Sequence, residues 1–424
     1  MKKRYLIILL TIVWSNFTNA QVYTEKQTRH RFAQLTLGAD YQTSIGGTTK
    51  YFDANGSVQS LSLGNIQSPR FLIGGTHFWG HADFYIAIPL LYPSFQKDNQ
   101  TSTYSSGVET VFKYYPWRIE WNKVRPFVGV GLTTFYFEQQ NKNLEYGNGA
   151  ELNHTTIPLY AGLTFNKKQH LLELGILWNY NNTQAYHISR NKAVDITAPP
   201  IYASISYRYL LDTTLGAEES WESGQIEKVT KQLAASKQLN GMHIGVGLSS
   251  AFWIRESSYN KNDRPYLEKY STSIMPDFSI GYYLHHPDVG FALGYRGYGT
   301  STTAYGTNQN LNRKSLVLEA TQFLFDYHGF VPFVGPAVSY EKLSFKESFE
   351  GQLTHDISKN KLGYGVAFGW DIRPTRMQSW ILRTNLRWFP NLNLEVKKDK
   401  VISFDTIEFN FIQLIVYPSR MRKK

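Results

Sequence analysis

The chain carries the same order of segments twice, and this repeat constrains its fold more than any other feature. Phe71-Leu72-Ile73-Gly74 corresponds to Phe278-Ser279-Ile280-Gly281, and Pro126-Phe127-Val128-Gly129 recurs as Pro332-Phe333-Val334-Gly335. An internal repeat predicts structural units of the same kind, arranged one after the other. Each copy contains eight candidate strands.

Within each copy, apolar residues alternate with polar or small residues at a period of two. Leu362, Tyr364 and Val366 share one face of a candidate strand, and Gly363 and Gly365 share the other. Segments of about ten residues with this alternation are typical of strands that cross a membrane in a closed barrel. Aromatic residues make up 15% of the chain and charged residues 18%, and Tyr and Trp are enriched at membrane–water interfaces.

The connections between the candidate strands alternate between long and short. The long connections include Ser44–Asn65, Arg255–Ser271, Gly299–Arg313 and Phe345–Asn360. Phe78–Ala82 and His285–Asp288 are short, and Pro116–Arg125 is an exception of medium length. Outer-membrane barrels have short periplasmic turns and long outer loops. With a periplasmic N-terminus, the long connections are therefore expected on the outside.

The two ends and the middle of the chain read differently from the repeats. Lys2-Lys3-Arg4 followed by the apolar run Tyr5–Trp14 is typical of a secretory signal peptide. The linker carries Ile226, Val229 and Leu233 at helical spacing. The predicted organisation is a signal peptide (1–20), an N-terminal periplasmic segment (21–31), a first eight-stranded repeat (32–211), a partly helical periplasmic linker (212–239), a second eight-stranded repeat (240–418) and a basic tail (419–424).

Backbone groups in lipid must be paired internally, so strands span membranes only in closed barrels. The sixteen strands could form two eight-stranded barrels or one sixteen-stranded barrel. A linker far longer than any periplasmic turn favours an all-β fold of two tandem eight-stranded transmembrane antiparallel β-barrels. The single sixteen-stranded barrel remains the alternative.

The glycine-rich amphipathic strands, the run Phe112-Lys113-Tyr114-Tyr115 before a turn, and Pro-Phe-Val-Gly opening the fifth strand of each copy carry a resemblance. On these features the chain resembles the small eight-stranded outer-membrane barrels of the OmpA, OmpX and OmpW type, in the form found in Bacteroidota, present as a tandem duplication. The resemblance implies an outer-membrane location and an eight-stranded architecture, and it implies no particular activity.

Charged residues of both signs fall on the faces predicted to point into the barrels. One reading of them is an ion path, and the other is a network of salt bridges that fills a narrow lumen. Buried charges persist when they are paired, and an eight-stranded lumen is just wide enough for side chains to fill. The second reading is favoured because Leu72, Phe127, Phe135, Leu171 and Leu177 also point inward. The predicted lumen network comprises Arg70, Asp83, Glu109, Lys113, Glu173, Arg208, Asp277, Arg296, Glu319, Arg383, Arg387 and Glu408. Glu109 and Arg208 are expected to pair within the first barrel, with Lys113 and Glu173 as further partners.

Catalytic chemistry has weaker support. His154, His187 and His355 fall in predicted outer loops, and Ser189 follows His187 closely, but a nucleophile, a base and an orienting group must converge in space. No His or Cys spacing suits a metal. The sequence therefore predicts no catalytic residue, cofactor or metal site.

These features favour the role of an integral outer-membrane protein with a structural or surface-interaction function through its outer loops. A porin-like channel or transporter for small solutes is the alternative, and a lipid-modifying enzyme or protease is the second alternative. The expected partners are outer-membrane lipid, lipopolysaccharide and the barrel-assembly machinery. The net charge of +11 is assigned to an anionic lipid surface, since export argues against nucleic acid.

Overall fold

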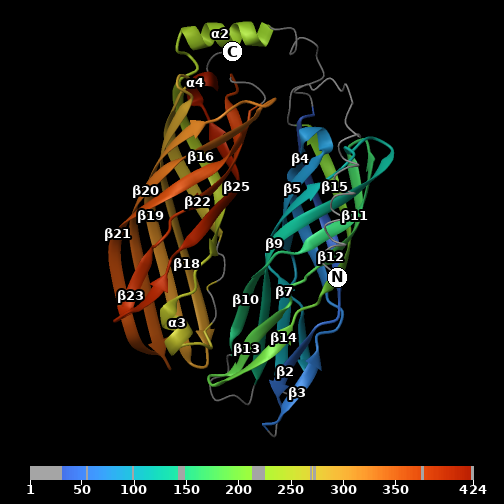
Figure 1. Cartoon of the computed structure of the whole chain (residues 1–424), viewed down its shortest axis with the longest axis vertical. Coiled ribbons are helices and arrows are strands. Elements are labelled where there is room, and N and C mark those ends of the chain that lie inside the picture. Colours follow the sequence, from blue (N-terminus) through green and yellow to red (C-terminus); the bar gives the residue numbers. More distant parts are fainter. Residues whose placement is uncertain are drawn as a thin grey trace, which may run out of the picture.

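The protein consists of two β-rings that stand side by side with their long axes nearly parallel (Figure 1). The structure is a computed structural model that describes residues 31–53, 56–97, 100–141, 149–212, 225–267, 270, 274–373 and 377–421. The predicted signal peptide (1–20) lies outside the described residues, as do 21–30 and 213–224.

The second ring is a closed barrel in which every strand pairs with both neighbours. Its strands are β16 (Gly241–Trp253), β17 (Ile274–Leu284), β18 (Val289–Ala304), β19 (Thr307–Phe323), β20 (Phe330–Phe349), β21 (Gln352–Ile372), β22 (Trp380–Trp388) and β25 (Thr406–Val416). The last strand, β25, pairs with β16 and closes the ring. A ring that closes with eight strands confirms the two-barrel prediction and excludes one sixteen-stranded barrel.

The first ring contains eight strands in the same arrangement. They are β1 (Ala33–Ile45), β4 (Gln67–His77), β5 (Ala82–Pro89), β8 (Glu109–Tyr114), β9 (Lys123–Asn141), β11 (Leu159–Lys167), β12 (His170–Trp178) and β15 (Ile201–Asp212). Ladders join them from β11 through β12, β15, β1, β4, β5 and β8 to β9. At the remaining seam the Gly131 N–H donates to the Pro158 carbonyl at 2.8 Å, and the Asn122 N–H donates to the Asn166 carbonyl at 2.7 Å.

The alternation of the sequence becomes an inside and an outside. On β12, Leu172, Leu174 and Ile176 are exposed, whereas Leu171 and Leu177 are buried. Exposed apolar side chains of this kind recur around both rings, which is the outer surface expected of strands that face lipid. Among the described residues, none of the helices has the length and apolar character needed to cross a membrane.

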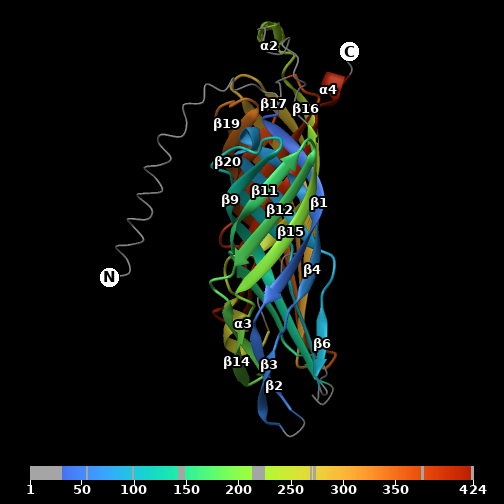
Figure 2. The same ribbon diagram turned by 90° about the vertical axis from the view of Figure 1, so that its right-hand side faces the viewer.

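Beyond the apolar belt the chain continues as β-hairpins on the side away from the linker (Figures 1 and 2). These strands are β2 (Thr48–Phe52), β3 (Val58–Ser62), β6 (Ser94–Lys97), β7 (Gln100–Ser106), β10 (Glu151–Thr156), β13 (Thr183–Ser189), β14 (Lys192–Thr197), β23 (Asn393–Lys397) and β24 (Lys400–Ser403). The long connections and the short turns therefore lie at opposite ends of the rings, as the connection lengths predict.

Two long connections of the second ring, 299–313 and 345–360, were predicted as outer loops, and this prediction is wrong. Both segments are paired strands joined by a tight turn. Strands β18 and β19 run on to a tight turn at Tyr305-Gly306, and β20 and β21 meet at Glu350-Gly351. Both residues of each turn have positive φ, which matches the right-handed twist of the paired strands. The apolar–polar alternation that predicts strands is weak in these segments, which are rich in Asn, Thr and Ser. Strands that extend into water need no apolar outer face, so their backbone pairing leaves no such pattern.

The short helices lie at the ends of the rings. Helix α2 (Gln225–Ala235) belongs to the linker and lies at the top of Figure 1. Helix α3 (Ser258–Asp263) lies at the end of the second ring away from the linker, which is called the outer end. The turn η1 (Phe78–Gly80) joins β4 to β5. The predicted basic tail begins within α4 (Pro418–Met421), where Arg420 Nη2 donates to the Leu239 carbonyl at 2.6 Å; residues 422–424 lie outside the described residues.

Candidate functional site

The interior of the first ring holds two clusters of paired charges. Arg70 Nη2 lies 2.5 Å from Asp40 Oδ2, and Arg70 Nη1 lies 2.5 Å from Glu109 Oε2. In the second cluster, Arg208 binds Asp83 at 2.6 Å and Glu173 at 3.2 Å. Lys113 also pairs with Glu173. Each buried cation therefore has at least one carboxylate partner, the condition under which a charge persists in a protein interior.

The interior of the second ring holds one continuous chain of ion pairs with alternating sign. The chain runs in the order Glu341, Arg313, Glu408, Arg296, Glu319, Arg387 and Asp277, with successive N–O distances that include 2.7, 2.8, 2.9 and 3.5 Å at its first four links and 2.6 Å at its last. Asn410 adds a hydrogen bond to Asp277 at 2.8 Å. A separate pair joins Arg383 Nε to Asp371 Oδ1 at 2.7 Å.

The structure places all twelve residues of the predicted lumen network in buried positions. The expected pairing of Glu109 with Arg208 is wrong, because Arg70 binds Glu109 and Asp83 binds Arg208. Sequence reasoning missed Asp40, Arg313 and Glu341 as members of these networks. Strict alternation could have found Arg313, because it stands an even number of positions from Glu319 on β19. Arg313 was missed because the strand was expected to begin only after it.

Apolar side chains fill the space between the charges of the first ring. Leu72, Tyr85, Phe127 and Leu177 belong to one buried cluster in that ring. The Lys113 ammonium lies 4.4 Å from the Phe127 ring centroid. A water-filled channel would leave such groups poorly solvated, so the arrangement is that of a packed interior.

The histidines considered for catalysis are distributed over separate hairpins. His154 lies on β10, His187 and Ser189 lie on β13, and His355 lies on β21, where its Nδ1 is 3.5 Å from Glu347 Oε1. Within the described part of the chain, no group of three His, Cys, Asp or Glu residues could hold a metal ion.

The two rings contact each other at three heights. Near the linker end, Phe78 packs against Phe330 with ring centroids 5.4 Å apart. Within the apolar belt, Phe84 packs against Phe411 at 4.9 Å. At the outer end, Arg190 Nε donates to the Tyr305 carbonyl at 3.0 Å.

The outer contact continues into a shared apolar core. The first ring contributes side chains that include Phe137, Tyr186 and Ile196, and the second contributes Tyr266 and Tyr305. In addition, the Tyr305 hydroxyl donates to the His187 carbonyl at 2.8 Å. The rings are therefore joined outside the lipid belt by a core of their own.

Two rings of paired strands, an apolar outer belt and packed, charge-paired interiors define a transmembrane β-barrel protein. No protein-family model matches the sequence, and no curated protein matches it. Its structure is similar to that of Neisserial surface protein A (17% identity, TM-score 0.28, 42% of this chain and 97% of that chain). It is also similar to Ail, the attachment invasion locus protein of Yersinia pestis (13% identity, TM-score 0.26, 42% and 96%). A further similarity is to an outer membrane channel from Pseudomonas putida F1 (9% identity, TM-score 0.20, 93% and 99%).

Proposed function

We propose that this chain is an integral outer-membrane protein of a Gram-negative bacterium, with two non-conducting barrels and a surface-interaction role at its outer end. The observation that carries the proposal is the ion-pair chain from Glu341 to Asp277, which occupies the interior of the second ring. With the lumens filled, the surfaces left for function are the outer hairpins and the lipid-facing belt. The tandem duplication of a Bacteroidota-type barrel belongs to the same proposal.

The outward face of the second ring suggests one partner. Four outward residues, Tyr295, Leu316, Tyr340 and Leu362, are aligned across β18 to β21 and form an apolar row. The next row toward the outside consists of Gly297, Lys314, Lys342 and Asn360. A basic row that adjoins the apolar row on its outer side is suited to the boundary between lipid head groups and acyl chains.

Lys314 and Lys342 stand directly opposite each other on neighbouring strands, and both are exposed. Like charges in this position repel each other, and neither lysine has an ion-pair partner within the described residues. An anion that binds between them would remove the repulsion. We therefore propose lipopolysaccharide as the partner, with a phosphate group of its lipid A seated at Lys314 and Lys342.

Two measurements test the proposal with the full-length protein. In planar bilayers, the protein should show no conductance steps of a wide pore; such steps would support the alternative function of a solute channel. In native mass spectrometry, the Lys314→Ala/Lys342→Ala variant should bind lipid A about tenfold more weakly, whereas dephosphorylated lipid A should not distinguish it from the wild type.

The matched control for the lysine pair is Lys346→Ala. Lys346 lies on the same outer face, but it already pairs with Asp356 at 3.0 Å. Its removal should leave lipid A binding nearly unchanged. Equal binding by all variants would refute the assignment of the phosphate site.

A further inference from the structure

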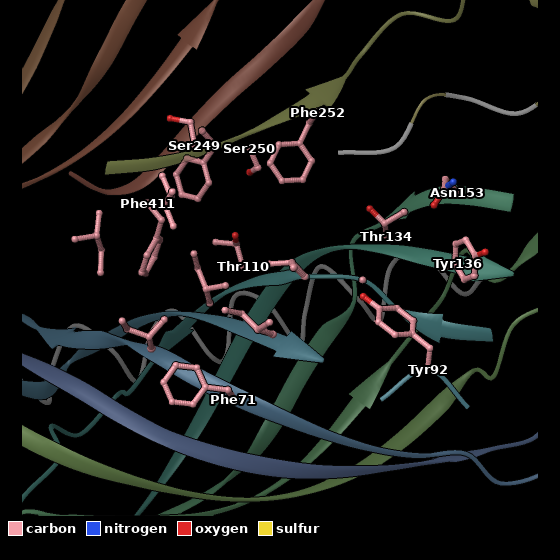
Figure 3. Close-up of a pocket in the computed structure, with 18 of the residues that line it drawn as sticks. Phe71, Tyr92, Thr110, Thr134, Tyr136, Asn153, Ser249, Ser250, Phe252 and Phe411 are labelled. Atoms are coloured by element: carbon pink, nitrogen blue, oxygen red, sulfur yellow. The ribbon is translucent and has the colours of Figure 1, made fainter. Parts of the chain in front are cut away.

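A crevice of about 910 Å³ lies between the two rings. Strands β4, β5, β7, β8, β9 and β10 contribute to one wall, and β16 and β25 form the other (Figure 3). Barrel–barrel contacts flank the crevice, with Phe84 against Phe411 in the apolar belt and Arg190 against Tyr305 at the outer end. The crevice is thus the space left where the two rings separate between these two contacts.

Most of the crevice wall is apolar. Phe71, Ile73 and Ile88 line it from the first ring, and Leu248 and Ile412 line it from the second. Water in such a space would find few hydrogen-bond partners, and an empty space would forfeit dispersion contacts along both walls. Since the walls are continuous with the lipid-facing belt, an acyl chain is the occupant that suits them.

One end of the crevice is polar. Tyr92, Tyr136 and Asn153 gather there, opposite the end marked by Phe71 and Phe411 (Figure 3). Glu151 is the one charged residue among the described residues that line the crevice, and no Lys, Arg or His is among them. Charge complementarity at this end favours a positively charged head group.

The acidic character extends one residue beyond the lining. Glu138 stands directly opposite Glu151 in the β9–β10 register, two positions further out along the ladder than the Tyr136–Asn153 pair. The Tyr136 hydroxyl donates to Glu138 Oε2 at 2.7 Å. Burial and the neighbouring Glu138 carboxylate raise the pKa of Glu151 to about 7, and a cation at this point would offset both effects.

We propose that the crevice between the rings binds one phospholipid with an ammonium head group, its acyl chains between the rings and its head at Glu151. This site is separate from the lysine row, which faces outward on β19 and β20 and would take an anionic head group. A lipid held here adds apolar contact between the rings in the interval where their side chains do not meet.

The test uses the full-length protein in nanodiscs with equal amounts of phosphatidylethanolamine and phosphatidylglycerol, followed by native mass spectrometry of the retained lipid. We expect one retained phosphatidylethanolamine. Thr110→Trp, which adds bulk at a lining position labelled in Figure 3, should abolish retention. Leu174→Trp on β12, an exposed position away from the crevice, is the matched control and should retain the lipid.

The head-group assignment has its own pair of variants. Glu151→Gln should weaken phosphatidylethanolamine retention by about tenfold, because a charge-assisted hydrogen bond is lost. Asp195→Asn removes an exposed carboxylate from the outer hairpin β14 and should have no effect. A heat-dependent gel shift verifies that each variant is folded. Equal retention of both phospholipids, retention unchanged in Thr110→Trp, or no retained lipid in the wild type would each overturn the proposal, irrespective of lipid A binding at the lysines.

Discussion

Arg70 and Glu109 form an ion pair across the interior of the first ring, although their strands, β4 and β8, are separated by β5. Arg70 also binds Asp40 on the neighbouring strand β1 through two hydrogen bonds of 2.9 and 2.5 Å. One guanidinium thus links three strands of the ring through buried contacts, and the consequences of removing it can be measured.

Replacement of Arg70 by Met should destabilise the first ring strongly. Asp40 and Glu109 would both remain buried without a cation, and breaking one side of a buried ion pair costs about 3–5 kcal/mol. Glu109→Gln should cost less, about 1–3 kcal/mol, because Arg70 keeps its two bonds to Asp40. The midpoint temperature of the folded-to-unfolded gel shift reports both effects. Arg255→Met, at an exposed arginine, is the control; an equal loss in all three variants would contradict the lumen argument.

Each ring should fold without the other. A fragment from Asn240 to Lys424 contains a closed ring with no unpaired edge, and a fragment from Gln21 to Leu211 contains the first ring. Both should refold in detergent as heat-modifiable monomers, because each ring pairs its backbone groups internally, by continuous ladders in the second ring and by ladders plus the β9–β11 seam contacts in the first. The Gln21–Leu211 fragment should unfold at the lower temperature, because within the described residues its β9–β11 seam has no continuous ladder. Failure of the second ring to gain protease resistance would show that it depends on the first.

Arg190→Ala should loosen the contact between the rings at their outer end. The substitution removes the hydrogen bond to Tyr305 and the packing of the guanidinium 4.5 Å from the Phe349 ring centroid. The chain has no cysteine, so spin labels at Lys50→Cys and Lys359→Cys can report the distance between the rings. We expect a broader distance distribution in Arg190→Ala than in the wild type. The control Arg255→Ala should leave the distribution unchanged. An unchanged distribution would show that the apolar core alone holds this contact.

The turn that precedes β9, at the linker end of the first ring, should respond to acid through Glu120. Hydrogen bonds from Lys123, Arg118 and Arg125 lower the pKa of Glu120 from 4.5 to about 2. A lowered carboxyl pKa stabilises the folded state above the unfolded pKa, and this contribution is lost as the pH falls from about 4.5 toward 2. Glu120 is partly exposed, so the effect should be at most about 1 kcal/mol. The difference in unfolding midpoint between the wild type and Glu120→Gln should shrink over this pH range; a constant difference would contradict the assignment.

The orientation of the rings can be tested with epitope tags. A tag inserted at Gly56, in the connection between β2 and β3, should be labelled on intact cells. A tag inserted after Lys237, next to the linker helix α2, should be labelled only after the outer membrane is permeabilised. The expectation follows from the long hairpins at one end of the rings and the short turns at the other. The reverse pattern of labelling would invert the topology.

The sequence alone determined which side of each strand a residue occupies. Period-two alternation placed Arg70, Asp83 and Glu319 inside because successive side chains of a strand point to opposite faces. It also indicated eight strands in each copy, since every transmembrane strand needs its own apolar face. Where a segment leaves the lipid this signal ends, so the outer part of β19, with Arg313, was expected to be a loop. Glu341 fell within an expected strand, but it was not assigned to the lumen network.

Only the tertiary structure decided which inward residues meet. Alternation specifies the face but not the height within the barrel, and height depends on strand tilt and register. Glu109 therefore meets Arg70 and not Arg208. The contact of the two rings at Phe84 and Phe411, and the crevice beside it, likewise have no signal in the sequence, because residues that face a second ring and residues that face lipid are apolar for the same reason.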